Sequence, residues 1–338
     1  MRVVYFVQSH DAPELLGRLV ERLRAPRSGS LIIVGHDASR RAVSAADLPH
    51  GDDVAVRVGT VPVRRGELSC LEPYLDACRW LVDERIDFDW LVYLSGRDYP
   101  VRPVAAIERD LAGSPYDGAI RTWDVLSAVS PWGLRRGRRR YFYQYRGLPA
   151  RWRWPLKLAK PFLRLAGREL SLVYGVHLGV PARPPLFGSG LVCYGGYQWH
   201  NLRRAAVEHL VQATRPGQPI VEYFHRTLVP DEALVQTVLV NAGRFRLLDD
   251  TRRFADTHER PGGHARFLDM ADAATCTDGR HDFARRFDAT LSRDLLDWLD
   301  AEVHGLRARP LRYGPAAGAP IPPCDPVASG HPVTASGR

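Results

Sequence analysis

The sequence predicts an α/β protein in which a mostly parallel central sheet is flanked by helices. Short runs rich in β-branched and aromatic residues alternate with amphipathic stretches of helical spacing, which is the pattern of strands joined by crossover helices. Polar residues directly follow the strand-like runs, and in such sheets ligands bind at the carboxyl ends of the strands. We therefore expect a ligand site along that edge of the sheet.

The first hundred residues supply the expected strands in order. Buried-strand runs occupy 2–9, 30–37, 54–59 and 89–100. Helical spacing follows the first and third runs, at 11–25 and 69–84. Polar residues clustered after the strands are typical of a nucleotide site. On this ground the predicted nucleotide or donor site contains Ser9, His10, Asp37, Ser95, Gly96 and Asp98.

The rest of the chain is expected to complete the same domain. A Gly-rich strand or hairpin followed by a helix is predicted over 183–212, a late strand over 244–250 and a closing helix over 283–303. We predict one domain over 1–308. The Pro/Gly/Ala-rich residues 309–338 have little apolar patterning and are expected to form a disordered tail.

The net charge of +9 comes almost entirely from arginine, because Lys157 and Lys160 are the only lysines. Arginine pairs bidentately with phosphate oxygens, so the composition fits a phosphate-binding protein. Coding bias explains the same excess equally well at any single surface position.

The cysteines and the apolar runs bear on the compartment. The five cysteines are scattered without CxxC spacing, which argues against a zinc site and against a disulfide framework. No run approaches the ~18 apolar residues of a membrane span. The first ten residues read as a strand rather than as a signal peptide. We expect a cytoplasmic protein, with peripheral contact at the inner face of the membrane as an alternative.

Residues 132–168 are dense in arginine and aromatic residues and contain no acidic residue. One interpretation is nucleic-acid binding. A second is docking of 134–168 on a membrane surface, and a third is a solvated insertion, at about 130–170, on the acceptor side of an enzyme. We favour the last two, because no nucleic-acid-binding motif accompanies the segment.

The stretch TLVPDEALVQTVLVN, residues 227–241, places two carboxylates ahead of a helical apolar pattern. Pro230 suits the first helical position, and Asp231 is expected to be an ordinary acidic residue of the first turn. A capping box around Glu232 would need Ser or Thr at position 229, where the chain has valine. Helix capping therefore explains Glu232 only in part, and a catalytic role stays open.

A metal-binding role for Asp87 and Asp89 is not expected. An Asp-x-Asp triplet holds a divalent metal on the diphosphate in many nucleotide-sugar transferases of this α/β type. Here the triplet precedes its strand, whereas the ligand edge lies after it. Without a metal, cationic side chains must neutralise a departing diphosphate. Arg266, and Arg285 with Arg286 at the start of the closing helix, are the candidates.

Five ordered motifs resemble a known family. They are LSGRDYP (94–100), YGGYQWHNL (194–202), TLVPDEALVQTVLVN (227–241), HAR (264–266) and FARRFD (283–288). In this order they resemble the core-2/I-branching β-1,6-N-acetylglucosaminyltransferases and peptide O-xylosyltransferases, glycosyltransferase family 14. The motifs at 227–241 and 283–288 look closest to the xylosyltransferase branch and its bacterial relatives.

The resemblance implies a GT-A-like fold and an inverting transfer from a UDP-sugar, with no metal and no other cofactor. Glu232 matches the general base that deprotonates the acceptor hydroxyl. Arg285 and Arg286 match the basic pair at the diphosphate, Arg266 a further phosphate-binding arginine, and Asp37 the aspartate that contacts the nucleoside. Trp199 and Asp231 are placed on the acceptor side.

Two positions depart from the family pattern. Gln198 stands where xylosyltransferases carry an acidic residue near the donor sugar, so xylose itself is in doubt. Arg65 replaces the tryptophan of a Trp-Gly-Gly opening near the uracil, so UDP is expected but its stacking differs.

The resulting prediction is a metal-independent glycosyltransferase that moves an N-acetylglucosamine or xylose-like sugar to an acceptor hydroxyl. The acceptor stays open among a glycan, a glycolipid and a secondary metabolite. The alternative is a protein of the same fold that binds a nucleotide sugar or glycan without catalysis. A third class, a nucleic-acid-binding protein built on 132–168, is disfavoured.

Overall fold

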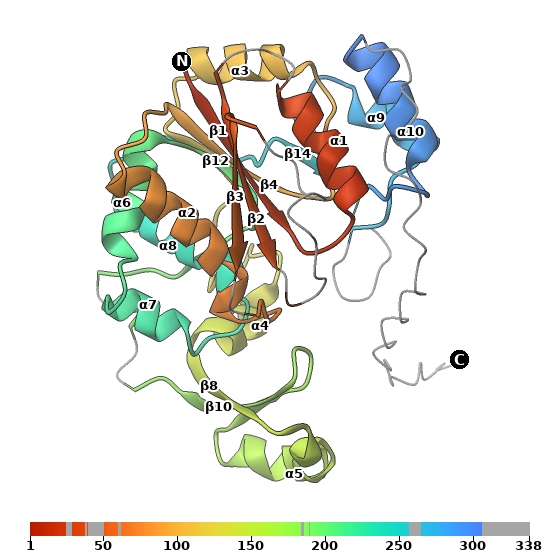
Figure 1. Ribbon diagram of the computed structural model, residues 1–338. Coiled ribbons are helices and arrows are strands. Elements are labelled where there is room, and N and C mark those ends of the chain that lie inside the picture. The colour runs from red at the N-terminus through yellow and green to blue at the C-terminus, as the bar shows by residue number, and fades with distance from the viewer. Residues whose placement is uncertain are drawn as a thin grey trace.

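The computed structural model describes residues 1–24, 29–37, 39, 51–59, 62–183, 186–188, 190–256 and 265–305. Within them, a seven-stranded sheet with the order β13-β6-β12-β4-β1-β2-β3 lies at the centre, and helices cover both of its faces (Figure 1). The expected α/β class with a mostly parallel sheet is confirmed. The predicted tail at 309–338 lies outside the described residues.

The amino-terminal half forms the strands and helices that the sequence predicts. Parallel pairing joins β3 to β2, β2 to β1 and β1 to β4. This order, 3-2-1-4, is that of the first half of a dinucleotide-binding sheet. The elements are β1 (Val3–Ser9), α1 (Pro13–Arg24), β2 (Leu31–Asp37), β3 (Val54–Gly59), α2 (Glu72–Asp83), β4 (Trp90–Ser95), β5 (Asp98–Pro100) and α3 (Val104–Gly113).

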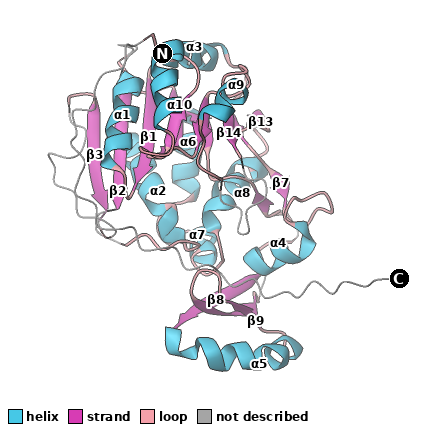
Figure 2. Ribbon diagram, turned by 90° about the vertical axis from the view of Figure 1, so that its right-hand side faces the viewer, coloured by secondary structure: helices cyan, strands magenta, loops and turns pink. Residues whose placement is uncertain are grey.

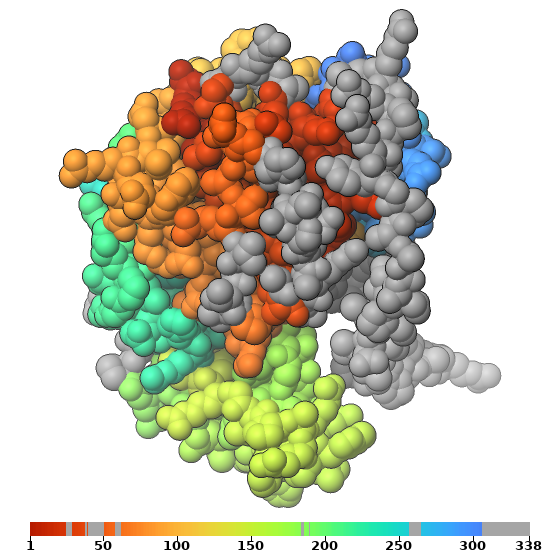
Figure 3. All heavy atoms as spheres, viewed as in Figure 1, coloured from red at the N-terminus to blue at the C-terminus, as the bar shows by residue number. Residues whose placement is uncertain are grey.

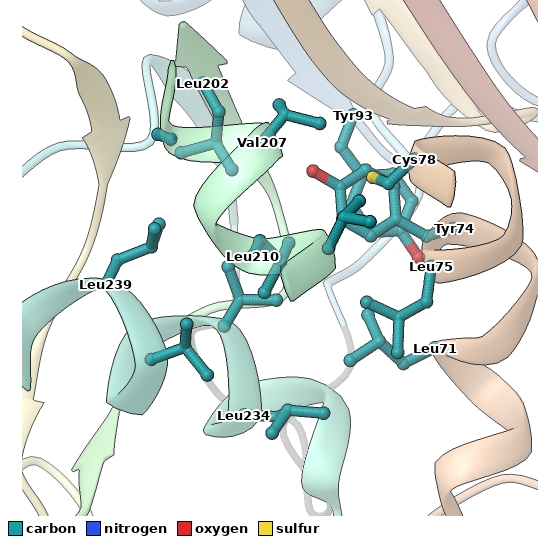
Figure 4. Close-up of a cluster of buried hydrophobic side chains, with 14 of the residues drawn as sticks. Leu71, Tyr74, Leu75, Cys78, Tyr93, Leu202, Val207, Leu210, Leu234 and Leu239 are labelled. Atoms are coloured by element: carbon teal, nitrogen blue, oxygen red, sulfur yellow. The ribbon is translucent and has the colours of Figure 1, made fainter. Parts of the chain in front are cut away.

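Strand β1 shows why these apolar runs become buried strands. Successive side chains point to opposite faces. Val3, Tyr5 and Val7 enter the core beneath α1, α3 and α10 (Arg293–Trp298). Val4 and Phe6 enter a second core formed with α2, α6 (Arg204–Ala213) and α8 (Leu234–Asn241), part of which Figure 4 shows around Tyr74 and Tyr93.

The sheet continues beyond β4 with strands of mixed direction. Strand β12 runs antiparallel to β4 and to β6, and the predicted late strand is the two-residue β13, parallel to β6. The elements between α3 and β14, apart from residues 133–181, are β6 (Gly118–Ile120), β7 (Trp123–Asp124), β11 (Tyr194–Gly195), β12 (His200–Arg203), α6 (Arg204–Ala213), α7 (Pro219–Phe224), α8 (Leu234–Asn241) and β13 (Leu247–Leu248).

The closing helix is shorter than predicted, and its expected first turn is a strand. Phe283–Arg285 is β15, which pairs antiparallel with β5 and parallel with β14 (Arg253–Ala255). Arg285 therefore ends a strand, and Arg286 follows it, because this segment completes a three-stranded sheet beside the main one. Helix α9 (Ala273–Cys276) precedes it. Helix α10 (Arg293–Trp298) begins later and continues as a π-helical turn over Leu299–Val303.

The basic segment 132–168 forms regular helices and strands. Helix α4 (Gly133–Tyr141) leads into a small sheet of β8 (Tyr143–Leu148), β10 (Val176–Pro181) and β9 (Glu169–Ser171), in which β10 is central. Helix α5 (Arg153–Leu165) connects β8 to β9. We call residues 143–181 the arm, because they project away from the central sheet (Figures 1–3).

Two expectations about apolar runs and cysteines can be compared with the described residues. There, no helix has the length and apolar character needed to cross a bilayer. Cys70, Cys78, Cys193 and Cys276 are free thiols, as expected, and Cys324 lies outside the described part.

Candidate functional site

The predicted donor residues gather where β1 and β4 end side by side. The buried Asp98 carboxylate holds the turn after β4, accepting hydrogen bonds from the Ser95 backbone N–H (2.8 Å) and hydroxyl (2.9 Å). Gly96 lies against Ser9, and its N–H donates to the carbonyl of Gln8. A Cβ atom at Gly96 would lie 3.3 Å from the Ser9 hydroxyl, so a glycine lets the two strand ends meet closely.

A polar network that sequence reasoning missed lies beside these strand ends. Gln198 Nε2 donates to the Tyr93 hydroxyl at 2.6 Å and to Gln8 Oε1 at 3.3 Å, and the Tyr93 hydroxyl donates to Gln8 Oε1. Gln8 Nε2 in turn donates to the carbonyl of Cys70 at 2.9 Å. Gln8 and Tyr93 alternate with apolar residues in buried strands, and only the pairing of β1 with β4 brings them together.

The first of the two basic candidates, Arg285, is firmly held. Its Nε lies 3.5 Å from the Asp98 carboxylate, and its guanidinium carbon lies 3.9 Å from the centre of the Trp199 ring. Antiparallel pairing places Arg285 opposite Asp98. Burial lowers the pKa of Arg285, against the effect of Asp98. A guanidinium nonetheless keeps its charge, because its ordinary pKa is above 12.

Arg286 differs from Arg285 because no carboxylate within the described residues pairs with it. Its guanidinium carbon lies 4.7 Å from the centre of the Phe267 ring. Burial lowers the pKa of Arg286 and the nearby positive charges of Arg97 and Arg285 lower it further, against the effect of the Asp11 carboxylate. A partly buried cation with cationic neighbours is a ready site for an anion.

The third predicted phosphate ligand, Arg266, lies beside Arg286 but is already paired. Its guanidinium bonds the Asp256 carboxylate at 2.6 Å and that of Asp272 through both terminal nitrogens. Backbone hydrogen bonds connect the two arginine segments, from Arg286 N–H to Arg266 and from Leu268 N–H to Arg286. The structure therefore brings Arg266 near the basic pair, with its side chain turned to two carboxylates.

The two predicted acidic residues form a separate turn ahead of α8. Pro230–Glu232 is a single 3₁₀ turn, and α8 begins only at Leu234. The prediction that Asp231 lies in the first turn of that helix is therefore wrong. Val229 precedes the turn in the left-handed conformation (φ 58°), which is unfavourable for a β-branched residue. Hydrogen bonds hold it, because its N–H donates to Gly66 and its carbonyl accepts from the Tyr141 hydroxyl.

The carboxylate of Glu232 is oriented by Arg140, a residue that sequence reasoning did not single out. Arg140 Nη1 donates to Glu232 Oε2 at 2.7 Å, and its guanidinium stacks 4.5 Å from the centre of the Trp132 ring. The Arg140 side chain is 16% exposed and that of Glu232 is 30% exposed. Glu232 Oε1 accepts no hydrogen bond from the described residues. One oxygen is thus fixed and the other is available.

Asp231 is held in a different electrostatic state from an ordinary surface carboxylate. Burial raises its pKa to about 7, and the neighbouring Glu232 carboxylate adds to the shift. Its Oδ1 is buried without a hydrogen-bond partner. A carboxyl group in this setting holds a proton near neutral pH, because ionisation would leave an unpaired charge beside a like one.

The segment 194–199 connects the acidic and basic sides of the site. The Gly196 N–H donates to the carbonyl of Glu232 at 2.8 Å, while Trp199, three residues later, stacks on Arg285. A Cβ atom at Gly196 would lie 1.9 Å from the Arg121 carbonyl oxygen, so only glycine fits there. One short segment therefore fixes both Glu232 and Arg285 in relation to the strand ends.

The remaining predicted residues, Asp37, Arg65 and His10, lie around this centre and differ in the contacts that they make. The buried Asp37 carboxylate accepts from Ser39 and from the Val63 N–H, so it shapes the segment beside Arg65. Arg65 stacks on Tyr174 of the arm, and its charge acts on both Asp231 and Arg286. The largely exposed His10 lies 3.8 Å from Asp11.

The acidic triplet lies at the opposite edge of the sheet from these residues. Asp89 accepts from the backbone N–H of Arg2 and Asp87 pairs with Arg204, both at the start of β4. Within the described ranges, no three His, Cys, Asp or Glu side chains form a group that could hold a metal ion.

Comparison with known proteins assigns the segment that carries the acidic side. Residues 134–278 match the family model for Core-2/I-Branching enzymes. This segment, less than half of the chain, is similar to that family. The matched segment includes Arg140, Gln198, Trp199, Glu232 and Arg266, whereas Arg285 and Arg286 follow it. Over these residues, the match confirms the family resemblance expected from the motifs.

The curated relatives are xylosyltransferases of much greater length. Xylosyltransferase 2 of Canis lupus familiaris is 26% identical over 134 residues, which cover 35% of this chain and 16% of that protein. The Homo sapiens protein is 25% identical over the same length. The matched segment thus spans about a sixth of these relatives.

Solved structures with partial similarity include two nucleotide complexes. S. aureus TarS in complex with UDP-GlcNAc is 12% identical, with a TM-score of 0.26 over 36% of this chain and 34% of that one. HddC from Yersinia pseudotuberculosis, complexed with GMP-PN, is 13% identical, with a TM-score of 0.28 over 64% and 80%. The GT-A-like fold assignment rests on the sheet and on the family match.

Proposed function

We propose that this protein transfers a sugar from a UDP-sugar to an acceptor hydroxyl, with inversion and without a metal. The observation that carries the proposal is the segment 194–199, which contacts Glu232 through Gly196 and Arg285, the neighbour of Arg286, through Trp199. Glu232 has one carboxylate oxygen fixed by Arg140 and the other available. Arg286 is a partly buried cation without a carboxylate partner in the described part of the chain.

An inverting transfer is a single displacement at the anomeric carbon, and it needs one base and one group that stabilises the leaving charge. Glu232 Oε1 takes the proton of the acceptor hydroxyl while the oxygen of that hydroxyl bonds to the anomeric carbon. The bond from that carbon to the diphosphate oxygen breaks, and the released negative charge lies next to Arg286 and Arg285.

The neighbouring residues support these two roles. Arg140 orients the Glu232 carboxylate, while Asp98 and Trp199 hold Arg285. We assign Arg266 a positioning role, because its side chain is paired with Asp256 and Asp272 while its backbone holds the Arg286 segment. Gln198 and Asp37 are assigned to the donor sugar and the nucleoside, and Trp199 and Asp231 to the acceptor side.

The donor sugar is proposed to be N-acetylglucosamine or a xylose-like pentose. The names of the curated relatives support sugar transfer in general, and Gln198 distinguishes this chain from the acidic position that the motif resemblance implies. A hydroxyl of a glycan, a glycolipid or a secondary metabolite is the proposed acceptor, and the cytoplasm the proposed compartment.

The test is a screen of UDP-, GDP- and dTDP-sugars for binding and slow hydrolysis in EDTA, with wild type and two carboxylate variants. Glu232→Gln is expected to bind the UDP-sugar like wild type and to lose turnover by ~10²–10⁴-fold, the usual contribution of a positioned base. Glu208→Gln, on the exposed side of α6, is the matched control and should turn over normally.

Two outcomes contradict the proposal. Binding of a UDP-sugar with no turnover, unaffected by Glu232→Gln, identifies the non-catalytic binding protein instead. Turnover that is abolished by EDTA and restored by Mg²⁺ or Mn²⁺ shows that a metal takes the part assigned to the arginines.

A further inference from the structure

Helix α5, at the end of the arm, has an apolar face that no described residue covers. Trp154 is 68% exposed, Leu158 76%, Phe162 72% and Leu165 87%. Their spacing of three or four residues puts them on one side of the helix. Single exposed apolar residues are ordinary, whereas a continuous row of four large ones marks an interaction surface.

The exposed row is not the face that attaches α5 to the protein. Leu156, Ala159 and Leu163 are half-buried and lie on another side of the helix, where α5 packs against β9. Since this stripe already anchors α5, the row of Trp154, Leu158, Phe162 and Leu165 is additional and points away from the arm. We call this row the α5 face.

Basic side chains flank the α5 face and no acidic residue accompanies it. Arg153, Lys157 and Arg164 are exposed on the same helix, and residues 132–168 contain neither Asp nor Glu. Lys157, one of the two lysines of the chain, has its ammonium group 4.9 Å from the centre of the Trp154 ring. An amphipathic helix with tryptophan, leucine and basic residues arranged in this way suits an anionic interface.

The position of α5 leaves it accessible to an extended surface. In Figures 1 and 2 it is the element of the described chain farthest from the central sheet, beyond β8 and β10. The other end of the arm reaches the catalytic side, because the Tyr145 N–H bonds Arg226 and Tyr174 stacks under Arg65. A body that contacts α5 therefore lies on the Glu232 side of the molecule.

We propose that the α5 face docks on the surface of an anionic lipid bilayer, with the apolar row in the acyl boundary and the basic side chains at the phosphate groups. Charge complementarity selects this partner over a second copy of the chain, because two such faces would bring like-charged segments together. The docking rests on α5 alone and does not require the transfer reaction.

The experiment is flotation of the full chain with phosphatidylcholine vesicles, with and without phosphatidylglycerol. Wild type is expected to float with the anionic vesicles, and less so at high salt, because the basic contribution is screened. The double variant Leu158→Glu/Phe162→Glu should lose vesicle partitioning by about tenfold or more, since it places two carboxylates in the acyl boundary. Leu291→Glu, which replaces an equally exposed leucine near α10, is the matched control and should float like wild type.

Four results would overturn the proposal. The first is wild type that fails to float with anionic vesicles, and the second is a double variant that floats as well as wild type. The third is a vesicle-free change from dimer to monomer in the double variant, which assigns the α5 face to self-association. The fourth is oligonucleotide binding that is weakened by Lys157→Glu but not by Leu158→Glu/Phe162→Glu, which assigns the basic side chains to nucleic acid. Circular dichroism establishes that the variants are folded.

Discussion

The two sides of the candidate site each contain a pair of adjacent like charges, and they relieve the repulsion differently. On the acidic side, Glu232 is paired with Arg140, and Asp231 can be protonated near neutral pH because its pKa is raised to about 7. On the basic side, Arg285 is paired with Asp98, but Arg286 cannot lose its proton at any ordinary pH. A carboxyl group can become neutral, whereas a guanidinium needs an anion. The Asp11 carboxylate acts on Arg286 but is itself paired with Arg97, so an anionic ligand adds a charge balance on the basic side that the acidic side does not need.

The most direct way to break this comparison is to remove the unbalanced cation. Arg286→Ala should lower turnover of the UDP-sugar by ~10²–10³-fold, the usual cost of losing one donor to a developing negative charge. Arg266→Ala should cost much less, because that side chain is already paired with carboxylates. Steady-state kinetics with both variants, checked by urea unfolding, measures the difference. Equal losses would contradict the distinction between the two arginines.

A second variant tests whether Arg140 serves Glu232. Arg140→Gln should lower kcat by ~10–10²-fold with an unchanged KM for the donor, because the base loses its orientation while the donor contacts stay intact. Arg138→Gln, an exposed neighbour on α4, is the control. The role of Arg140 is wrong if the variant raises KM and leaves kcat as it was.

The third prediction concerns the proton on Asp231. Its pKa is near the ordinary 3.8 in the unfolded chain and about 7 in the folded one, so between pH 4 and 7 the folded state binds more protons. Asp231 therefore costs stability progressively as pH rises through this window. Asp231→Asn should be more stable than wild type at pH 8, by up to ~4 kcal/mol for a shift of this size, and equal to it below pH 4. Urea unfolding at both pH values measures this, and a stability difference that does not change with pH would refute it.

The smallest effect is expected at Arg65, whose positive charge acts on both sides of the site. Arg65→Gln should raise the apparent pKa of Asp231 by a few tenths of a unit, on the order expected for an exposed charge in a high-dielectric setting. The pH dependence of unfolding in this background, with and without Asp231→Asn, isolates the shift. An unchanged pH dependence would mean that Arg65 does not act on Asp231, and a shift to lower pH would contradict the expected sign.

The parts of the fold that the sequence predicts well are those fixed by local patterning. Strands β1, β2 and β4 are apolar runs bounded by polar residues, and they are buried on both faces, as such runs are in parallel sheets. Strand β15 was predicted as helix, because three residues carry no period of their own. It becomes a strand only by pairing with β5, almost two hundred residues earlier.

The candidate site divides in the same way. Glu232 and Arg286 could be identified from ordered motifs and from a missing cap at Val229. Arg140 could not, because it is one of five arginines in a nine-residue helix, and only packing of its neighbours Gly137 and Tyr141 aims it at Glu232. The raised pKa of Asp231 likewise could not be predicted, because it depends on burial, which the sequence of the motif does not show.

The close packing at Gly196 has a consequence for any attempt to change the donor sugar that we propose for this protein. A library that randomises residues 194–199 would fill with misfolded members, since every side chain at position 196 collides with the Arg121 backbone. A library that keeps this glycine and varies Gln198 avoids that collision, because Gln198 contacts the side chains of Tyr93 and Gln8 rather than backbone. Substitutions should therefore be tolerated at Gln198 but not at Gly196, although the two residues lie in the same short segment.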